Sequence, residues 1–192
     1  MSKLARKPIP IPEAVNVVVG DTEVVVTGPK GTLRLPLRHA AHVTFKIDGR
    51  QLFVNRVADN REGRMYQGLY FALLKNMVTG VTEGYTRTLE IVGVGYSAQL
   101  QDDKLILKLG FSHPYTFTLP AGIRAAVDSK GTEITISGID KYLVGETAAN
   151  IRAIKPPEPY KGTGIKYKDE RIIRKLGKAA LAGAGAGAGA KK

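Results

Sequence analysis

The chain repeats one order of strands and turns at an interval of about 80 residues. Residues 20–37 and residues 101–119 each read as a strand, a turn and a second strand, and a Leu-Pro pair lies at or near the end of each, at 35–36 and at 119–120. A second strand pair follows in both halves, at residues 43–55 and residues 124–137, around turns rich in glycine. The repeat therefore predicts two similar domains, joined end to end near residues 81–85.

Each half is predicted to close with a helix. Residues 59–62 resemble a capping box, and Gly80 is expected to end the first helix. The apolar residues that recur at helical spacing in it, and so predict its buried face, are Met65, Leu69, Leu73 and Met77. The second helix is predicted from about Asp140 to the prolines at 156 and 157, which cannot continue a helix. Its predicted face consists of Leu143, Thr147, Ile151 and Ile154.

The fold class that follows is α+β, with two tandem copies of a small antiparallel sheet that each carry one packed helix, plus a basic C-terminal extension. The predicted boundaries are residues 1–82 for the first copy with its basic arm, and residues 83–155 for the second. Residues 156–192 form the extension, which ends in a Gly/Ala tail at residues 183–190 that is expected to be flexible when free.

Positive charge is concentrated at the two ends of the chain. The formal net charge is +12, from 29 basic and 17 acidic residues. Residues 155–192 hold 10 basic and 3 acidic residues, and residues 1–8 hold 3 basic residues and no acid, so these ends contribute +7 and +3. Such a distribution favours a neutral body whose ends bind a polyanion, and nucleic acid fits it better than a membrane because the tail lacks a bulky apolar face.

Residues 157–168 alternate lysines and tyrosines on a backbone that contains both proline and glycine. Lysine supplies mobile charge for phosphates, tyrosine a flat surface for a base or a sugar, and glycine lets the backbone approach a bulky ligand closely. The pattern indicates RNA binding. The alternative is a solvated basic tail, in which the tyrosines pack against their own domain.

Nothing in the sequence indicates catalysis, a cofactor or a metal. Cysteine is absent, and the three histidines at 39, 42 and 113 have no acidic or thiol partners at ligand spacing. Gly93 and Gly95 begin like a dinucleotide loop, but the chain continues as a strand, so they are expected to mark a bulge or a close backbone approach. With neither a secretion signal nor an apolar span, the chain is expected to be soluble and cytosolic.

In this order of elements the chain resembles the L-six family of large-subunit ribosomal proteins, in its bacterial form, over almost its full length. The segments that carry the resemblance are residues 2–9, the turn at 28–31, residues 92–96, residues 110–114 and above all residues 157–165. Two positions depart from the family pattern: Thr163 stands where lysine is usual, and Asp169 stands where glycine is expected. The first departure removes one potential phosphate contact, and the second questions the backbone turn after Lys168.

The resemblance implies a non-catalytic constituent of the large subunit. Such a protein is expected to bind large-subunit rRNA near its 3′ domain, beside the sarcin-ricin loop and the stalk base where translational GTPases dock, and to contact neighbouring ribosomal proteins. It implies a cytoplasmic, ribosomal location, no membrane and no small-molecule substrate. The expected rRNA-binding residues are Lys155, Tyr160, Lys161, Gly162, Gly164, Lys166, Tyr167, Lys168, Arg171, Arg174, Lys175, Lys178 and His113.

Two alternatives remain beside this interpretation. The same tail would also suit a free-standing regulator that binds other nucleic acids, and an RNA-processing enzyme would need a cofactor pocket or a general base. In the first copy, Arg56, Arg61 and Arg64 gather at the start of the predicted helix, where they face solvent or touch RNA.

Overall fold

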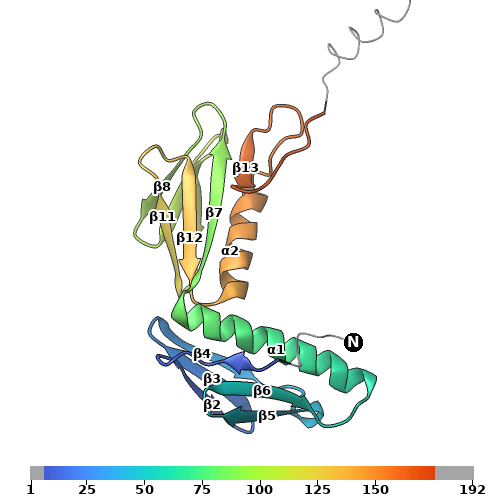
Figure 1. Ribbon diagram of the computed structural model, residues 1–192. Coiled ribbons are helices and arrows are strands. Elements are labelled where there is room, and N and C mark those ends of the chain that lie inside the picture. Colours follow the sequence, from blue (N-terminus) through green and yellow to red (C-terminus); the bar gives the residue numbers. More distant parts are fainter. Residues whose placement is uncertain (1–6, 176–192) are drawn as a thin grey trace, which may run out of the picture. The chain divides into compact units, whose positions relative to one another are not determined.

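The computed structural model describes residues 7–175 and divides the chain into two compact units (Figure 1). Unit 1 contains residues 1–86 and 137–144, and unit 2 contains residues 87–136 and 145–192. The basic arm at residues 1–6, Lys178 and the Gly/Ala tail lie outside the described residues. Neither of the two described helices has the length and apolar character needed to cross a bilayer.

Unit 1 has two three-stranded sheets and one long helix. Its first sheet has the order β2-β3-β4 and its second the order β1-β6-β5, with antiparallel pairing throughout. The elements are β1 (Ile9–Pro10), β2 (Asn16–Val19), β3 (Glu23–Gly28), β4 (Gly31–Pro36), a short 3₁₀ helix (Ala40–His42), β5 (Val43–Asp48), β6 (Gln51–Arg56) and α1 (Arg61–Thr82).

Unit 2 repeats this plan and adds a strand. Its sheets have the orders β10-β9-β8 and β11-β12-β7-β13. The elements are β7 (Tyr85–Val92), β8 (Ser97–Gln101), β9 (Lys104–Lys108), β10 (Tyr115–Thr118), β11 (Ile123–Val127), β12 (Glu133–Gly138), α2 (Lys141–Ile154) and β13 (Gly164–Tyr167). The first two residues of β7, the last two of β12 and the first four of α2 are assigned to unit 1. The hairpins β3-β4 and β9-β10 correspond, as do β5-β6 and β11-β12, so the predicted α+β duplication is confirmed.

Among the described residues of unit 1, no strand corresponds to β13. The strand β13 pairs with β7 in antiparallel register, with Gly164 opposite Val92 and Tyr167 opposite Leu89. Ile165 at its centre is fully buried. The sequence analysis treated residues 156–168 as part of an extension, whereas in the structure residues 164–167 of this stretch form a strand of the second sheet of unit 2.

The buried face of α1 is not the one that the sequence pattern predicted. Tyr70, Leu74, Val78 and Val81 pack in the core of unit 1, together with Met77. In contrast, Met65 and Leu69 are 55% and 46% exposed, and Leu73 is half-buried. The helix carries two apolar stripes, and the stripe with the aromatic and β-branched residues covers the sheets because it buries more apolar surface.

The ends of α1 also differ from the prediction. The N-cap is Asn60, whose side-chain oxygen accepts a hydrogen bond from the Gly63 amide at 2.6 Å. The helix continues past Gly80, where a Cβ atom would lie only 2.1 Å from the Ile139 carbonyl oxygen. This glycine therefore serves close packing, and the chain leaves the helix at Gly84, which has a φ of +78°.

The prediction for α2 holds. Its N-terminus is capped by Asp140, which accepts a hydrogen bond from the Tyr142 amide at 2.8 Å, and the helix ends before the prolines. Thr147 and Ile151 of the predicted face are buried, together with Ala148.

Candidate nucleic-acid interface

Strand register brings three loops of unit 2 to the same end of its sheets. Val92 at the end of β7 lies opposite Gly164 at the start of β13, so the loop at 93–96 adjoins the loop at 156–163. Ser97 at the start of β8 lies opposite Lys108 at the end of β9, so the loop at 93–96 also adjoins the loop at 109–114. These three loops and residues 171–175, which follow them, are called the loop face below.

The Tyr96 ring lies against both the loop at 93–96 and the loop at 109–114. A Cβ atom at Gly93 would lie 2.6 Å from this ring, and one at Gly110 would lie 3.0 Å from it. Both glycines also have positive φ values, so no other residue fits well at either position. The expected close approach at Gly93 is thus made by an aromatic ring, and Val94 beside it is fully exposed.

An exposed aromatic residue of the loop face lies beside Lys155, which directly precedes the loop at 156–163. The Phe111 side chain is 44% exposed, and the Lys155 ammonium lies 4.9 Å from the centre of its ring. His113 is exposed in the same loop, with its Nδ1 atom 3.2 Å from the Ser112 hydroxyl. This arrangement offers a ring for stacking and a cation for a phosphate within one small area.

Backbone hydrogen bonds within the loop at 156–163, and one from residue 175, hold the conformation of this loop. The Gly162 amide donates to the Glu158 carbonyl at 2.9 Å, and the Glu158 amide donates to the Thr163 carbonyl at 2.9 Å. The Lys175 amide donates to the Pro159 carbonyl at 2.9 Å, which ties residues 171–175 to the loop. Tyr160, 54% exposed, and the exposed Lys161 lie at its tip.

The two glycines of the predicted site are required by the protein's own packing. A Cβ atom at Gly164 would lie 2.6 Å from the Pro156 carbonyl oxygen and 2.8 Å from that of Lys155. Gly162 has a φ of +75° and faces the Arg174 side chain. Both glycines allow the backbone of the loop at 156–163 to turn back and enter β13 of the sheet.

Lys166, Tyr167 and Lys168 contact residues of their own unit. The Lys166 ammonium lies 2.8 Å from Glu90, and the Lys168 ammonium lies 3.2 Å from Glu133. The Tyr167 ring lies 5.8 Å from the Arg152 guanidinium. The sequence analysis left packing within the domain open as the alternative for the tyrosines, and for Tyr167 the structure has that packing.

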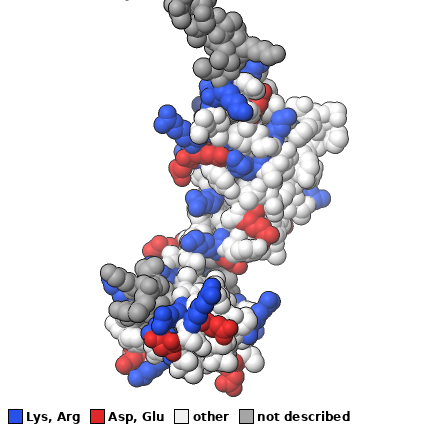
Figure 2. Space-filling model, turned by 90° about the vertical axis from the view of Figure 1, so that its right-hand side faces the viewer, with Lys and Arg blue, Asp and Glu red and all other residues white. Residues whose placement is uncertain are grey.

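The remaining cations of the loop face have no such acidic partner. Within the part of the chain that the structure describes, no ion pair involves Lys161, Arg171, Arg174 or Lys175, and all four are exposed. Figure 2 shows blue Lys and Arg side chains at the upper end of unit 2, with red Asp or Glu side chains among them, and a mixture of blue and red over unit 1. Unpaired exposed cations are the groups that release counterions when they meet phosphates.

The two departures from the family pattern fit the local structure. The Thr163 hydroxyl donates to the Glu158 carboxylate at 3.2 Å, so this position stabilises the loop. Asp169 has no positive φ, and the turn is closed by a hydrogen bond from the Glu170 amide to the Tyr167 carbonyl at 3.0 Å. A glycine is therefore not needed after Lys168.

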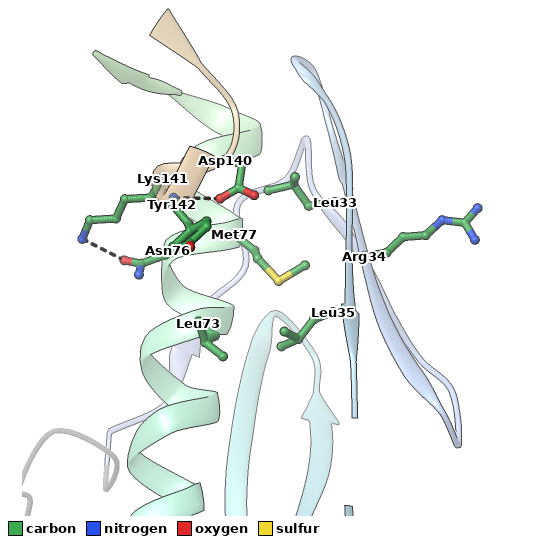
Figure 3. Close-up of a pocket in the computed structure, with 9 residues that line it drawn as sticks. All are labelled: Leu33, Arg34, Leu35, Leu73, Asn76, Met77, Asp140, Lys141 and Tyr142. Carbon is green, nitrogen blue, oxygen red and sulfur yellow. Dashed lines mark hydrogen bonds between the residues drawn. The ribbon is translucent and has the colours of Figure 1, made fainter. Parts of the chain in front are cut away.

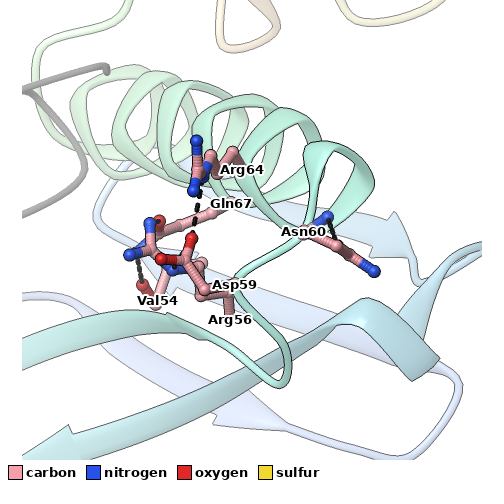
Figure 4. Close-up of polar contacts among 7 residues, drawn as sticks. Val54, Arg56, Asp59, Asn60, Arg64 and Gln67 are labelled. Carbon is pink, nitrogen blue, oxygen red and sulfur yellow. Dashed lines mark hydrogen bonds and ion pairs between the residues drawn. The ribbon is translucent and has the colours of Figure 1, made fainter.

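In unit 1, two of the three arginines near the start of α1 are held by one carboxylate (Figure 4). Asp59 lies 2.7 Å from Arg64 and 3.2 Å from Arg56. The hydrogen bond from Arg64 is the main cause that lowers the pKa of Asp59 from its usual value. Gln67 accepts from Arg56 at 3.5 Å and donates to the Val54 carbonyl at 2.9 Å. Arg61 remains exposed, and no ion pair is found for it among residues 7–175.

Val94 and Phe111 belong to the loop face but were not among the predicted site residues. Both lie within segments on which the family resemblance rests, 92–96 and 110–114, so the sequence carried a signal for them. That signal was interpreted as a bulge and a turn. Among the described residues, no cluster of three or more His, Cys, Asp or Glu side chains has the arrangement of a metal site.

The family model for ribosomal protein L6 matches the chain twice, over residues 11–84 and residues 92–168. The chain belongs to the ribosomal protein L6 family. Two of its curated relatives are "Large ribosomal subunit protein uL6" of Desulfatibacillum aliphaticivorans, 52% identical over 93% of this chain and 98% of the relative, and of Maridesulfovibrio salexigens, 49% identical over 93% and 99%. A third, of Thermodesulfovibrio yellowstonii, is 50% identical over 93% of this chain and 98% of the relative.

Membership in the L6 family confirms the resemblance found in the sequence. It also confirms that the protein is a structural ribosomal component and not an enzyme. The two matches of one family model fall on the two strand-and-helix copies seen in the fold, and the second match ends just after β13.

Proposed function

We propose that this protein is a structural constituent of the large ribosomal subunit that binds large-subunit rRNA through the loop face of unit 2. The binding region we propose lies in the 3′ domain of the rRNA, near the sarcin-ricin loop and the stalk base. A protein at this position would support the docking of translational GTPases but would take no part in their catalysis. The location comes from the family resemblance, and the structure contributes the surface.

The observation that carries the proposal is the gathering of exposed rings and unpaired cations on three adjoining loops. Phe111 and Tyr160 provide surfaces for a base or a ribose, since every base has a flat face that an aromatic ring can stack on. Lys155 adds a cation beside the Phe111 ring. His113 adds a hydrogen-bonding group that can meet a phosphate or a 2′-hydroxyl.

The basic residues of this region divide into two groups. Lys161, Arg171, Arg174 and Lys175 are free to neutralise phosphates, because no acidic side chain of the described residues competes for them. Lys166 and Lys168 already neutralise Glu90 and Glu133, so we assign them mainly to holding β13 in the sheet. Because of this division, the proposal can be tested by replacing the unpaired basic residues alone. Removing the whole C-terminal segment would also remove residues that hold β13 in the sheet.

Co-sedimentation tests the assembly itself. The full-length chain, tagged at its N-terminus and expressed in bacterial cells, is expected to remain with large subunits through moderate salt washes. Replacement of Lys161, Arg171 and Lys175 with glutamine is expected to release it at lower salt, since each lost phosphate contact weakens binding. Recovery of the unaltered protein only in the free fraction would instead support the free-standing regulator.

A further inference from the structure

The exposed side of α1 in unit 1 carries an apolar stripe that the fold leaves uncovered. Met65, Leu69 and Leu73 follow each other at intervals of four residues, and the first two are about half exposed. They span about 12 Å along the helix axis. Single exposed apolar residues are normal, but an aligned set of three on one helix indicates a contact surface.

A row of small side chains runs beside this stripe. Gly68 and Ala72 lie on the same side of the helix, and a Cβ atom at Gly68 would meet nothing within 4 Å. A glycine in the middle of a helix lowers the stability of the helix relative to alanine. The contacts within unit 1 give no reason for this cost, in contrast to Gly80, where a carbonyl oxygen lies against the helix.

The stripe continues into an apolar groove of unit 1 (Figure 3). The groove has a volume of about 470 Å³, and all of its lining residues belong to unit 1. Leu33 and Leu35 of β4 point into it opposite Leu73 and Met77 of α1, while Arg34 points away. Tyr142, 74% exposed, forms part of its wall. The stripe, the row of small residues and the groove are called the α1 face below.

An exposed cation without an ion-pair partner stands near each end of the stripe of the α1 face. Arg61 stands at the N-terminal end of the stripe and Lys75 lies beyond its other end, about 21 Å apart along the helix axis. Neither forms an ion pair among the described residues. Of the nearby acids, Asp59 pairs with Arg56 and Arg64. Glu62 lies 3.7 Å from the His42 imidazole, and Asp140, which lines the groove, accepts a hydrogen bond from the Tyr142 amide.

We propose that the α1 face is the docking surface for a helix of a neighbouring protein, with an apolar contact side and a carboxylate near each end. On a helix surface, a row of small residues beside a ridge of large side chains forms a groove, and the side-chain ridge of a second helix can pack into that groove. The carboxylates of the partner would meet Arg61 and Lys75. The inference goes beyond the loop face of unit 2, although it rests on the proposed assembly into the large subunit.

Three other occupants fit less well. RNA would set its phosphates against a stripe without charge, which removes their hydration without compensation. A second copy of this chain, related by a two-fold axis with the two helices antiparallel, would bring Arg61 of one copy to Lys75 of the other. Residues 1–6 of the chain itself carry Lys3 and Arg6, which have the same sign as those two cations.

Site-specific crosslinking distinguishes these occupants. The photoreactive residue p-benzoylphenylalanine replaces Leu69 in the full-length chain, which is assembled into large subunits in cells, and crosslinked peptides and nucleotides are identified by mass spectrometry. The matched control carries the same residue at Val18, which is also exposed but lies on β2. We expect crosslinks from position 69 to a helical segment of one ribosomal protein that is flanked by acidic residues.

Charge reversal supplies a second test, which uses the same crosslink at position 69 as its readout. The double variant Arg61→Glu, Lys75→Glu is expected to reduce the crosslink yield at position 69 at least tenfold, while the thermal unfolding of the free protein stays unchanged. Crosslinks from position 69 to rRNA, to residues 1–6 of the same chain, to a second copy, or to nothing in intact subunits would each overturn the proposal. Failure of the chain to enter subunits would overturn the proposed function instead, so the two failures are distinguishable.

Discussion

The guanidinium of Arg152 binds the carboxylate of Glu170 at two points, with Nε at 2.9 Å from Oε2 and a terminal nitrogen at 2.5 Å from Oε1. Glu170 also accepts a hydrogen bond from the Tyr167 amide at 3.1 Å. The pair connects α2 to the turn that follows β13. It therefore holds the start of residues 171–175, which carry the unpaired cations of the loop face.

Replacing Glu170 with glutamine is expected to lower the free energy of unfolding of unit 2 by about 1–2 kcal/mol, because a two-point charge-assisted pair is weakened. Asp169→Asn is the matched control, since Asp169 is exposed and forms no ion pair among the described residues. Urea unfolding measures the change. Equal effects of the two substitutions would contradict a stabilising role for the pair.

The contribution of this pair depends on pH in a defined direction. Hydrogen bonds from Arg152, and then from the Tyr167 amide, lower the pKa of Glu170 from its ordinary value of 4.5. The pair therefore stabilises the fold above the unfolded-state pKa, and this stability is lost as pH falls through the lower folded-state pKa. The difference between the unaltered protein and Glu170→Gln is expected to be constant from about pH 6 to 8 and to shrink below about pH 4.5. A difference that grows on acidification would contradict this assignment.

Ile165→Ala is expected to destabilise unit 2 by about 2–5 kcal/mol, because a fully buried side chain on β13 is removed. Ile173→Ala is the control, since Ile173 is 87% exposed. Hydrogen exchange of the β7 and β13 amides reports the local effect. If Ile165→Ala left this exchange unchanged, residues 164–167 would be a detachable tail and not a strand of the sheet.

The two glycines of α1 at 68 and 80 provide a matched pair within one helix. Gly68→Ala is expected to stabilise unit 1 by about 0.5–1 kcal/mol, because the new methyl group meets open space and the unfolded chain loses freedom. Gly80→Ala is expected to destabilise it, because its Cβ atom would lie 2.1 Å from the Ile139 carbonyl oxygen. Thermal unfolding of both variants measures the order, and the reverse order would contradict the described packing of α1.

The hydrophobic pattern predicted the strand pairs and the existence of both helices, because hairpins with glycine turns and helical spacing are local signals. It chose the wrong face of α1, since Met65 and Leu69 have the same spacing as Leu74 and Val78 and only the tertiary fold decides between them. It also missed β13. Lys166 and Lys168 beside Ile165 read as a charged tail, and the acids that neutralise them, Glu90 and Glu133, lie far away in the sequence.

The sequence predicted which types of residue form the candidate site better than it predicted how these residues are arranged in space. Tyr160 and Lys161 lie at the exposed tip of a loop, as a basic aromatic motif predicts. The meeting of Lys155 with Phe111 depends on the register of β7 with β13 and of β8 with β9, which joins segments that are far apart along the chain. Sequence spacing alone contains no information on that register.

The salt dependence of rRNA binding tests the central claim most directly. The full-length protein is titrated onto a transcript of the 3′ domain of large-subunit rRNA at several salt concentrations, and log K is plotted against log[salt]. Changing Lys161, Arg171 and Lys175 to glutamine is expected to reduce the magnitude of the slope by roughly 2–3, at about 0.7–0.9 per lost phosphate contact. The matched variant, with Arg38, Lys46 and Lys75 of unit 1 changed to glutamine, removes the same charge and is expected to leave the slope nearly unchanged. Equal slopes for both triple variants would contradict the claim that the loop face of unit 2 binds the RNA.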